Sequence, residues 1–499
     1  MTLLPAGKPL GRLTLAVAIG AACVWLIDLA LLRGGTPHPL DDTWEYGLVA
    51  RSLLAGHGFR TLLIHPPLWG LHDAAYSVPV LVHGPLLPLV GAPWLKWFGP
   101  GAIDATAWLA AAFAVVAAVF TARAVGRAAG PGNGAMAAAL VTASPVLMRM
   151  VHHDIAPAAG AGAVAILLDL LVRSRPNAFA AGVVTGAGVL VRPELLLAAP
   201  CAAYCLGIAR LAPFAIGLVL VALPWGWHTL AASGSPAYNL SSYLLIAYTR
   251  DHPGLSPLWD FAIPPAQWPA ALMHALPSLP AKWLHFGPRA VKHMIMVPGP
   301  GMGLLSGLGL LMGVQWPQTR RWALAASGAA LIPLVLGTVT ESSERYVAVF
   351  LPLWAAGAVH AAIAWGSGAT RVRQARIALL ALLLPFTLGT AWVEARQSAA
   401  LRDWLETERA ALASRSAPAL RHRLLFSDTP DFAAWTTGRP TIAITREAYL
   451  ALPAAARRSR AVPARGAAAD EWFHANVRAR PAPGGGDDAR AAGAASPAR

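Results

Sequence analysis

Charged side chains are scarce in this chain. They make up 13% of its 499 residues, whereas an ordinary soluble domain carries about 25%. Hydrophobic residues account for 56%, and the mean hydropathy is +0.52. So few charges cannot cover the surface of a soluble protein of this length, which excludes that class. The composition predicts an all-α polytopic membrane protein.

Cysteine is nearly absent, with three residues in the whole chain. Cys23, Cys201 and Cys205 lie within apolar segments, and no histidine or further cysteine stands beside them to complete a metal-ligand set. We expect all three to be free thiols that pack as small apolar side chains. Neither a disulfide framework nor a cysteine-based metal site is predicted.

Acidic residues are outnumbered, 24 Asp and Glu against 39 Lys and Arg, which gives a formal net charge of +15. Such an excess can indicate nucleic-acid binding. The arginines, however, are scattered among short loops and a C-terminal tail, without a basic stripe interleaved with aromatic residues. We therefore expect no nucleic-acid partner, because the charge fits loops that set membrane topology and meet anionic lipid headgroups.

Apolar segments recur from residue 13 to residue 393. The first, Leu13–Leu32, is long enough to span a bilayer and lacks a small-residue cleavage site, so we interpret it as a retained span. Lys8 and Arg12 precede it, which favours a cytoplasmic N-terminus and an outer loop over 33–80. About eleven spans are expected in all, the others lying near 81–98, 104–122, 134–150, 155–172, 178–198, 207–230, 299–314, 322–340, 346–366 and 376–393.

An odd number of crossings returns the chain to the outer side. The loop 231–298 and the region after 394 should then share a face with 33–80. In this topology the short inner loops carry Arg149, Arg210, Arg320, Arg321, Arg371, Arg373 and Arg376, and the outer loops carry Arg123, Arg127, Arg173 and Arg175. The excess of inner arginines follows the positive-inside rule.

Three regions are expected. Residues 1–393 form the membrane domain, with outer loops 33–80 and 231–298. Residues 394–480 form a small extracytoplasmic α/β domain that docks on it. The tail 481–499 lacks large apolar residues and should be disordered. Within the second region the pattern predicts a polar helix at 399–413, strands at 423–427 and 441–445, and a short helix at 428–435.

The stretch HPLDDTWEYGLVARSLLAGHGF at 38–59 places Asp41 and Asp42 just beyond the first span, where water meets lipid. Asp42 can cap a helix over 43–55, with Glu45 reaching back in a capping box. One side of that helix is apolar, made of Trp44, Leu48, Val49 and Leu53. Such a helix would lie along the membrane interface. On these residues alone, two carboxylates that merely cap a helix and face solvent remain an open alternative.

Four motifs in order resemble the GT-C class of membrane glycosyltransferases. DDTWEYGLVARSLLAGHG at 41–58 is similar to the start of the first extracytoplasmic loop, and HGPLLP at 83–88 to an H/K-P-P-L motif. VLVRPE at 189–194 resembles an inner Arg-Pro segment, and ERYVAVFLP at 344–352 the start of a late span.

The nearest resemblance is to glycosyltransferase family 39, which includes dolichyl-phosphate-mannose protein mannosyltransferases and bacterial aminoarabinose-type transferases. SDTPDFAAWTTGRP at 427–440 is similar to the outer domain of many bacterial members. The resemblance covers residues 10 to about 445. Two departures stand out: Asp42 replaces a common Glu, and Gly84 replaces the first Pro of the second motif.

The resemblance implies an enzyme that moves a sugar from a polyprenyl-phosphate donor to a glycan, lipid or protein acceptor, with inversion. It implies Asp41 as general base and Asp42 as its positioning partner. Arg345, beside Tyr346, would grip the donor phosphate, and His83 would meet phosphate or sugar. Weaker candidates for the phosphate are Arg250, Arg289, Lys292 and His293. The alternative interpretation of these residues, and of Arg345, is an ordinary headgroup anchor, and it is favoured for the four weaker ones.

The sequence suggests no metal-ligand set, and it neither requires nor excludes a divalent cation as cofactor. The polar group His152, His153 and Asp154 is interpreted as an inner loop, and Glu194 as a structural partner of Arg192. The expected location is a bacterial inner membrane, with the site on its outer face and membrane lipids around the spans. Two other classes stay open: a transporter or flippase of lipid-linked sugars, and a scaffold without activity.

Overall fold

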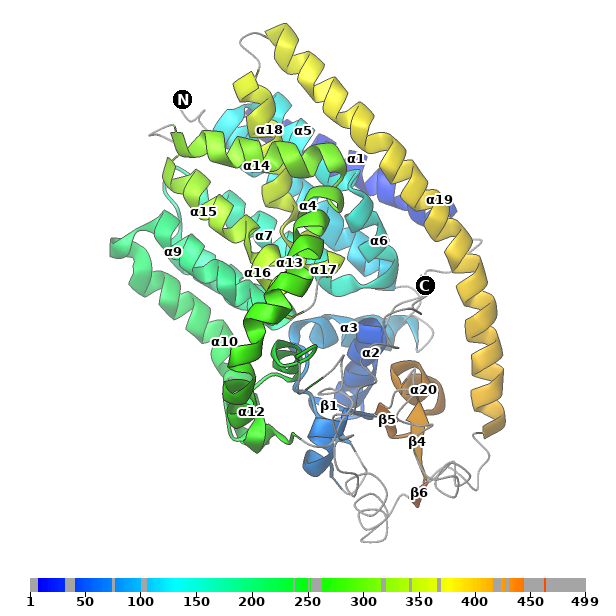
Figure 1. The fold of residues 1–499 in the computed structure, drawn as a ribbon. Helices are drawn as coiled ribbons and strands as arrows, with labels where there is room; N and C mark the ends of the chain where they lie inside the picture. The colour runs from blue at the N-terminus through cyan, green and yellow to red at the C-terminus, as the bar shows by residue number, and fades with distance from the viewer. Residues whose placement is uncertain are drawn as a thin grey trace.

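Helices form one bundle, with a small sheet below it (Figure 1). This computed structural model describes a set of stretches, to which the account below is confined. They are residues 8–31, 41–73, 77–99, 106–236, 238–249, 252, 263–315, 320–340, 343–365, 369–415, 423–427, 430–443 and 462–463. The tail 481–499 lies outside them, so its disorder stays a prediction.

Five helical stretches are long and apolar enough to cross a membrane, or up to seven if two bent pairs each count as one span. The five lie in α1 (Lys8–Leu31), α4 (Thr106–Ala129), α10 (Leu211–Ser233), α15 (Arg320–Ala330) with α16 (Ile332–Val339), and α19 (Ala369–Arg415). The pairs are α5 (Pro131–Thr142) with α6 (Pro145–His153), and α13 (Leu279–Met296) with α14 (Pro300–Gln315). A polytopic helical protein is thus confirmed, but the predicted count of eleven spans is not.

Small residues let the bundle helices approach closely. Shorter apolar helices complete the bundle: α7 (Ile155–Leu171), α8 (Ala178–Val191), α9 (Ala199–Leu206), α17 (Glu344–Val349) and α18 (Leu351–Trp365). A Cβ atom on Gly182 of α8 would lie 2.0 Å from the carbonyl oxygen of Phe214 in α10. A Cβ atom on Gly309 of α14 would lie 1.9 Å from the carbonyl oxygen of Gly357 in α18. Only glycine permits such contacts, which stabilise helix pairs in an apolar solvent.

The bundle has two chemically different ends. At the end that we call the site end, α6 stops at His153 and α7 starts after Asp154. At the opposite end, the far end, Asp169 near the close of α7 pairs with three arginines. Its partners are Arg173 at 2.9 Å, Arg123 at 3.6 Å, and Arg127. A helix of the length of α7 separates the two ends by about 25 Å.

This arrangement corrects the predicted topology. Arg123, Arg127 and Arg173 lie at the far end, while Arg149 lies at the site end, where its Nη1 atom is 2.9 Å from Oε2 of Glu344. The prediction placed them the other way round because it counted 81–98 as a span. Instead, α3 (Leu86–Phe98) has 13 residues. It is therefore about 20 Å long, too short for a bilayer core of about 30 Å.

The expected outer loop 231–298 is largely helical where the structure describes it. It contains α12 (Trp268–Ala275) and α13, with short 3-10 turns between them. Residues 286–294, FGPRAVKHM, therefore lie on a helix rather than in a loop.

A four-stranded sheet joins the C-terminal region to the first loop. Its order is β2 (Leu63–Ile64), β5 (Thr441–Ala443), β4 (Arg423–Ser427) and β6 (Val462–Pro463). The strands β2, β5 and β4 are parallel, and β6 is antiparallel to β4. The strand at 423–427 is confirmed, and the short helix appears as α20 (Pro430–Thr437). The predicted helix at 399–413 is confirmed, and it is the continuation of α19, which runs unbroken through these residues.

Candidate functional site

The helix α2 (Asp41–Leu54) carries the acidic pair and is a core element. It begins at Asp41 rather than at residue 43, and the side chain of Asp41 lies outside what the structure describes. Trp44 and Leu48 pack against Leu63 of the first loop and Trp435 of α20. Neighbours therefore cover the polar side of this helix as well as the apolar one, and its position along the membrane interface stays a prediction.

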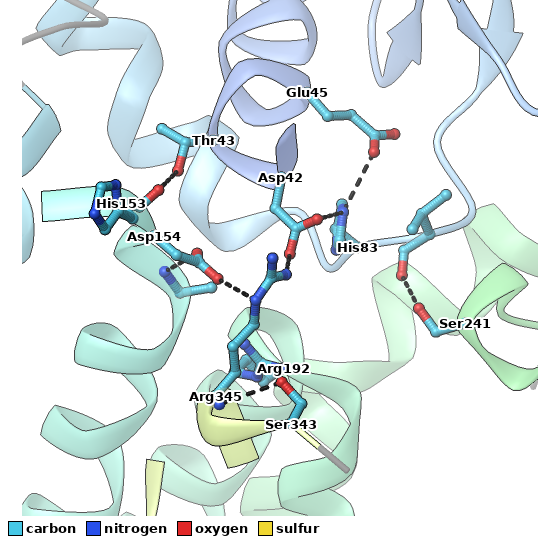
Figure 2. A network of polar contacts seen from close by, with 12 residues as sticks. Asp42, Thr43, Glu45, His83, His153, Asp154, Arg192, Ser241, Ser343 and Arg345 are labelled. Carbon is cyan, nitrogen blue, oxygen red and sulfur yellow. Dashed lines mark hydrogen bonds and ion pairs between the residues drawn. The ribbon is translucent and has the colours of Figure 1, made fainter. Parts of the chain in front are cut away.

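Asp42 and Asp154 converge on one guanidinium group (Figure 2). The Nη1 atom of Arg345 lies 2.5 Å from Oδ2 of Asp42, and its Nε atom lies 3.6 Å from Oδ2 of Asp154. The other oxygen of Asp154 accepts the backbone N–H of Ala156 and so caps α7. Ser343 caps α17 by accepting the backbone N–H of Arg345. Arg345 near the start of α17 therefore lies between Asp42 near the start of α2 and Asp154 at the start of α7.

His83 lies between two carboxylates of α2. Its Nε2 atom is 3.3 Å from Oε2 of Glu45 and 3.8 Å from Oδ1 of Asp42. Its ring is 4.8 Å from that of Tyr46. The Nε2 atom of His65 lies 4.0 Å from the same oxygen of Glu45. Glu45 thus faces the site instead of closing a capping box.

Arg192 brings a second guanidinium group to the cluster. It follows α8 and pairs with Glu194, as predicted. Its guanidinium carbon lies 5.9 Å from the centre of the Tyr346 ring, and its charge acts on Asp42. The Tyr346 hydroxyl is 3.2 Å from that of Thr340. Arg192 therefore lies on the same side as Asp42, not on the inner side that the motif resemblance implied.

The charges in this cluster fix its protonation. Burial raises the pKa of Asp42, but Arg345, His83 and Arg192 outweigh it and hold that pKa below its ordinary value. Burial also raises the pKa of Glu45, yet His83 and His65 lower it to about 2. For His83, burial lowers the pKa, while Glu45 and Asp42 raise it above 6.5. The surrounding charges therefore favour ionised carboxylates beside a protonated His83 ring.

The remaining predicted residues lie elsewhere. Arg289 and Lys292 are exposed on α13. His293 is half-buried and interacts electrostatically with Glu344 of α17. Arg250 lies outside the described residues. The structure therefore unites Asp42, His83, Arg345 and Tyr346 among the predicted residues and leaves the α13 residues apart from them.

The sequence interpretation missed Glu45, Asp154 and Arg192 as members of the cluster. Asp154 was taken for an inner loop residue together with His152 and His153. Instead, all three are buried: His152 contacts Asp28 of α1 at 2.8 Å, and His153 contacts Glu394 of α19. A correct span count would have indicated the position of Asp154, because it brings the residues after α6 to the face that carries Asp42.

The last feature of the site is whether its side chains could bind a metal ion. Among the residues that the structure describes, no group of three or more His, Cys, Asp or Glu side chains could hold a metal ion. The two carboxylates best placed for a cation, Asp42 and Asp154, already share the guanidinium of Arg345.

Comparisons with known proteins identify structures with a similar fold. No protein-family model and no curated protein matches the chain. Its structure is similar to that of ArnT from Cupriavidus metallidurans bound to undecaprenyl phosphate, at 13% identity, a TM-score of 0.55, and coverage of 88% of this chain and 87% of that one. It is also similar to the oligosaccharyltransferase AglB of Archaeoglobus fulgidus in complex with an inhibitory peptide and a dolichol-phosphate. There the identity is 14%, the TM-score 0.54 and the coverage 87% of this chain and 65% of that one. Both are GT-C glycosyltransferases, so the predicted GT-C resemblance is confirmed at the level of the fold.

Proposed function

We propose that this protein is an integral membrane glycosyltransferase. It moves a sugar from a polyprenyl-phosphate donor to an acceptor at the outer face of a bacterial inner membrane. The observation that carries the proposal is the Arg345 guanidinium held between Asp42 and Asp154 at one end of the membrane helices. A cation for a phosphate and carboxylates for a hydroxyl or amine then stand within one side-chain length of each other.

The donor explains why this chemistry belongs at a helix end. Its lipid tail cannot leave the bilayer, so its phosphate must react at headgroup level. Cleavage leaves a phosphate monoester dianion, and preorganised cations stabilise such a developing charge. Arg345 can bind two phosphate oxygens through its planar fork, while Arg192 and protonated His83 add charge beside it.

The general base is one of the two adjacent carboxylates at the start of α2. We assign this role to Asp41 and a positioning role to Asp42. The low pKa of Asp42 supports the division, because a strongly stabilised carboxylate is a weak base. The acceptor hydroxyl or amine attacks the anomeric carbon as its proton passes to Asp41, and the sugar–phosphate bond breaks. Attack opposite the leaving phosphate inverts the anomeric configuration.

The distribution of basic residues supports placing the site at the outer face of the membrane. Lys8 and Arg12 lie at the start of α1, and Asp28 near its end contacts His152 at the site end. The far end carries the three arginines around Asp169. A far end in the cytosol therefore obeys the positive-inside rule.

The deciding experiment uses the purified full-length protein in lipid nanodiscs. Lipid-linked sugars extracted from a strain lacking the protein accumulate the unused donor, which mass spectrometry identifies. That donor, labelled in its sugar, should be consumed with release of polyprenyl phosphate. Movement of intact labelled lipid across a bilayer without cleavage would overturn the proposal in favour of a flippase, and no change in the donor pool would favour a scaffold.

A further inference from the structure

We propose that Glu45 is a positioning residue that holds the His83 ring as a cation between two carboxylates. His83 then supplies a permanent positive charge beside the donor phosphate. This inference rests on the proposed function, since it assigns a role within the same site. It also goes further, because the sequence predicted for Glu45 only a capping contact.

The geometry places one ring nitrogen of His83 between two carboxylates. Oxygens of Glu45 and Asp42 lie 3.3 Å and 3.8 Å from the same atom, Nε2 of His83. That nitrogen must carry a hydrogen to face both. In a neutral ring the other nitrogen would then be an acceptor, whereas in the cation both nitrogens donate. Two negative charges on one side favour the cation.

Burial of the Glu45 carboxylate costs free energy unless a positive charge lies beside it. Glu45 is 3% exposed, and its Oε1 atom has no hydrogen-bond partner among the described residues. Removing a carboxylate from water costs several kcal/mol unless a cation compensates. The described side chains near it that can carry a positive charge are those of His83 and, more distantly, His65. The neighbouring histidines compensate the ionised form of Glu45, so the negative charge itself is the feature that needs a role.

Other charges around His83 do not substitute for Glu45. Asp42 on α2 shares its charge with Arg345 at 2.5 Å. Asp154, from the junction of α6 and α7, acts on the ring from farther away and contacts the same arginine. Glu45 is the nearest carboxylate to the ring, and its described partners are histidines.

The test is the pH dependence of donor turnover, kcat/KM, in the wild type and in Glu45→Gln. As pH rises, His83 loses its proton and turnover falls. Without the Glu45 charge the proton leaves earlier, so the alkaline limb of Glu45→Gln should move down by at least one pH unit. Its turnover at the acidic end of the profile should stay within a few-fold of the wild type.

A double-variant cycle separates this role from a structural one. His83→Lys keeps a positive charge up to a pKa of about 10, so its alkaline limb should disappear. Adding Glu45→Gln to His83→Lys should then leave the profile in place. The matched control is Glu344→Gln, a carboxylate of the site end that pairs with Arg149 and should not move the limb. Equal loss at every pH, or the same shift in the lysine background, would overturn the proposal.

Histidine NMR of the protein in micelles provides a readout that needs no substrate. The His83 signals, assigned by their loss in His83→Lys, should titrate above the ordinary histidine value in the wild type and at lower pH in Glu45→Gln. A His83 titration that is the same in the wild type and in Glu45→Gln would overturn the role of Glu45, even if sugar transfer is observed. A wild type that transfers no sugar sinks the proposed function and leaves the titration to decide the pairing. If Glu45→Gln does not fold, Glu45→Asp must retain the wild-type titration.

Discussion

The guanidinium of Arg345 lies 2.5 Å from Asp42, although the two residues come from helices at opposite ends of the membrane domain sequence. This ion pair neutralises the cation that the proposed donor phosphate would need. In the proposed function, the phosphate would therefore replace a carboxylate on Arg345, and the second carboxylate, Asp154, would keep the arginine aimed at the site.

Arg345→Ala should lower donor turnover by about 10² to 10³, as expected for loss of one preorganised contact to a developing charge. Arg345→Lys should recover part of it, because a lysine keeps the charge but not the planar fork. The comparison is Arg289→Ala, an exposed residue of α13. Labelled donor and released polyprenyl phosphate are the readout. If Arg289→Ala is as damaging as Arg345→Ala, the phosphate binds elsewhere.

Asp41→Asn should abolish transfer while leaving donor binding intact, because it removes the proton acceptor. Asp42→Asn should instead free Arg345 for the donor phosphate and tighten donor binding, with a smaller loss of the maximal rate. Single-turnover rates and donor affinity, measured separately, distinguish the two. Loss of chemistry in Asp42→Asn but not in Asp41→Asn would transfer the role of base to Asp42.

The sequence predicted the helical class, the apolar segments and four residues of the cluster, because composition and local motifs carry that information. It failed at α3, whose hydropathy resembles that of a span although the helix is too short to be one. That single error reversed the sides of Arg149 and Asp154, while the inner position of Arg192 came from the motif resemblance. The role of Glu45 was also out of reach, since its contact with His83 depends on tertiary packing and not on helix-capping rules.

The stability of the protein should depend on Glu45 in a defined pH range. Its pKa falls from 4.5 to about 2 in the folded state, a shift equivalent to roughly 3 kcal/mol shared with the histidines. Because the folded pKa is lowered, this stabilisation is present above pH 4.5 and is lost as pH falls towards 2. Thermal unfolding in detergent should show Glu45→Gln less stable than the wild type at pH 6, and the gap should narrow below pH 4.5 and close as the pH approaches 2. A gap that does not change with pH would indicate lost packing instead.

Docking of the C-terminal region on α2 should depend on Trp435. The Arg51 guanidinium carbon lies 3.2 Å from the centre of the Trp435 ring, and its Nη1 donates to the Trp435 carbonyl at 2.8 Å. Trp44 packs against the same ring at 5.7 Å. Trp435→Ala should cost about 3 to 5 kcal/mol of this contact and raise hydrogen exchange in β5 and α2. Trp97→Ala, at an exposed residue, is the control, and equal exchange in both variants would contradict the docking role.

Two glycines of α14 offer a matched test of bundle packing. A Cβ atom on Gly309 would meet the backbone oxygen of Gly357 at 1.9 Å, whereas one on Gly307 meets nothing within 4 Å. Gly309→Ala should separate α14 from α18 and lower the Tm, because a backbone atom cannot move aside as a flexible side chain can. Gly307→Ala should leave the Tm unchanged or raise it, since alanine favours a helix by up to about 1 kcal/mol over glycine. Thermal unfolding in one detergent measures both, and equal Tm values would mean that the two helices do not pack through Gly309.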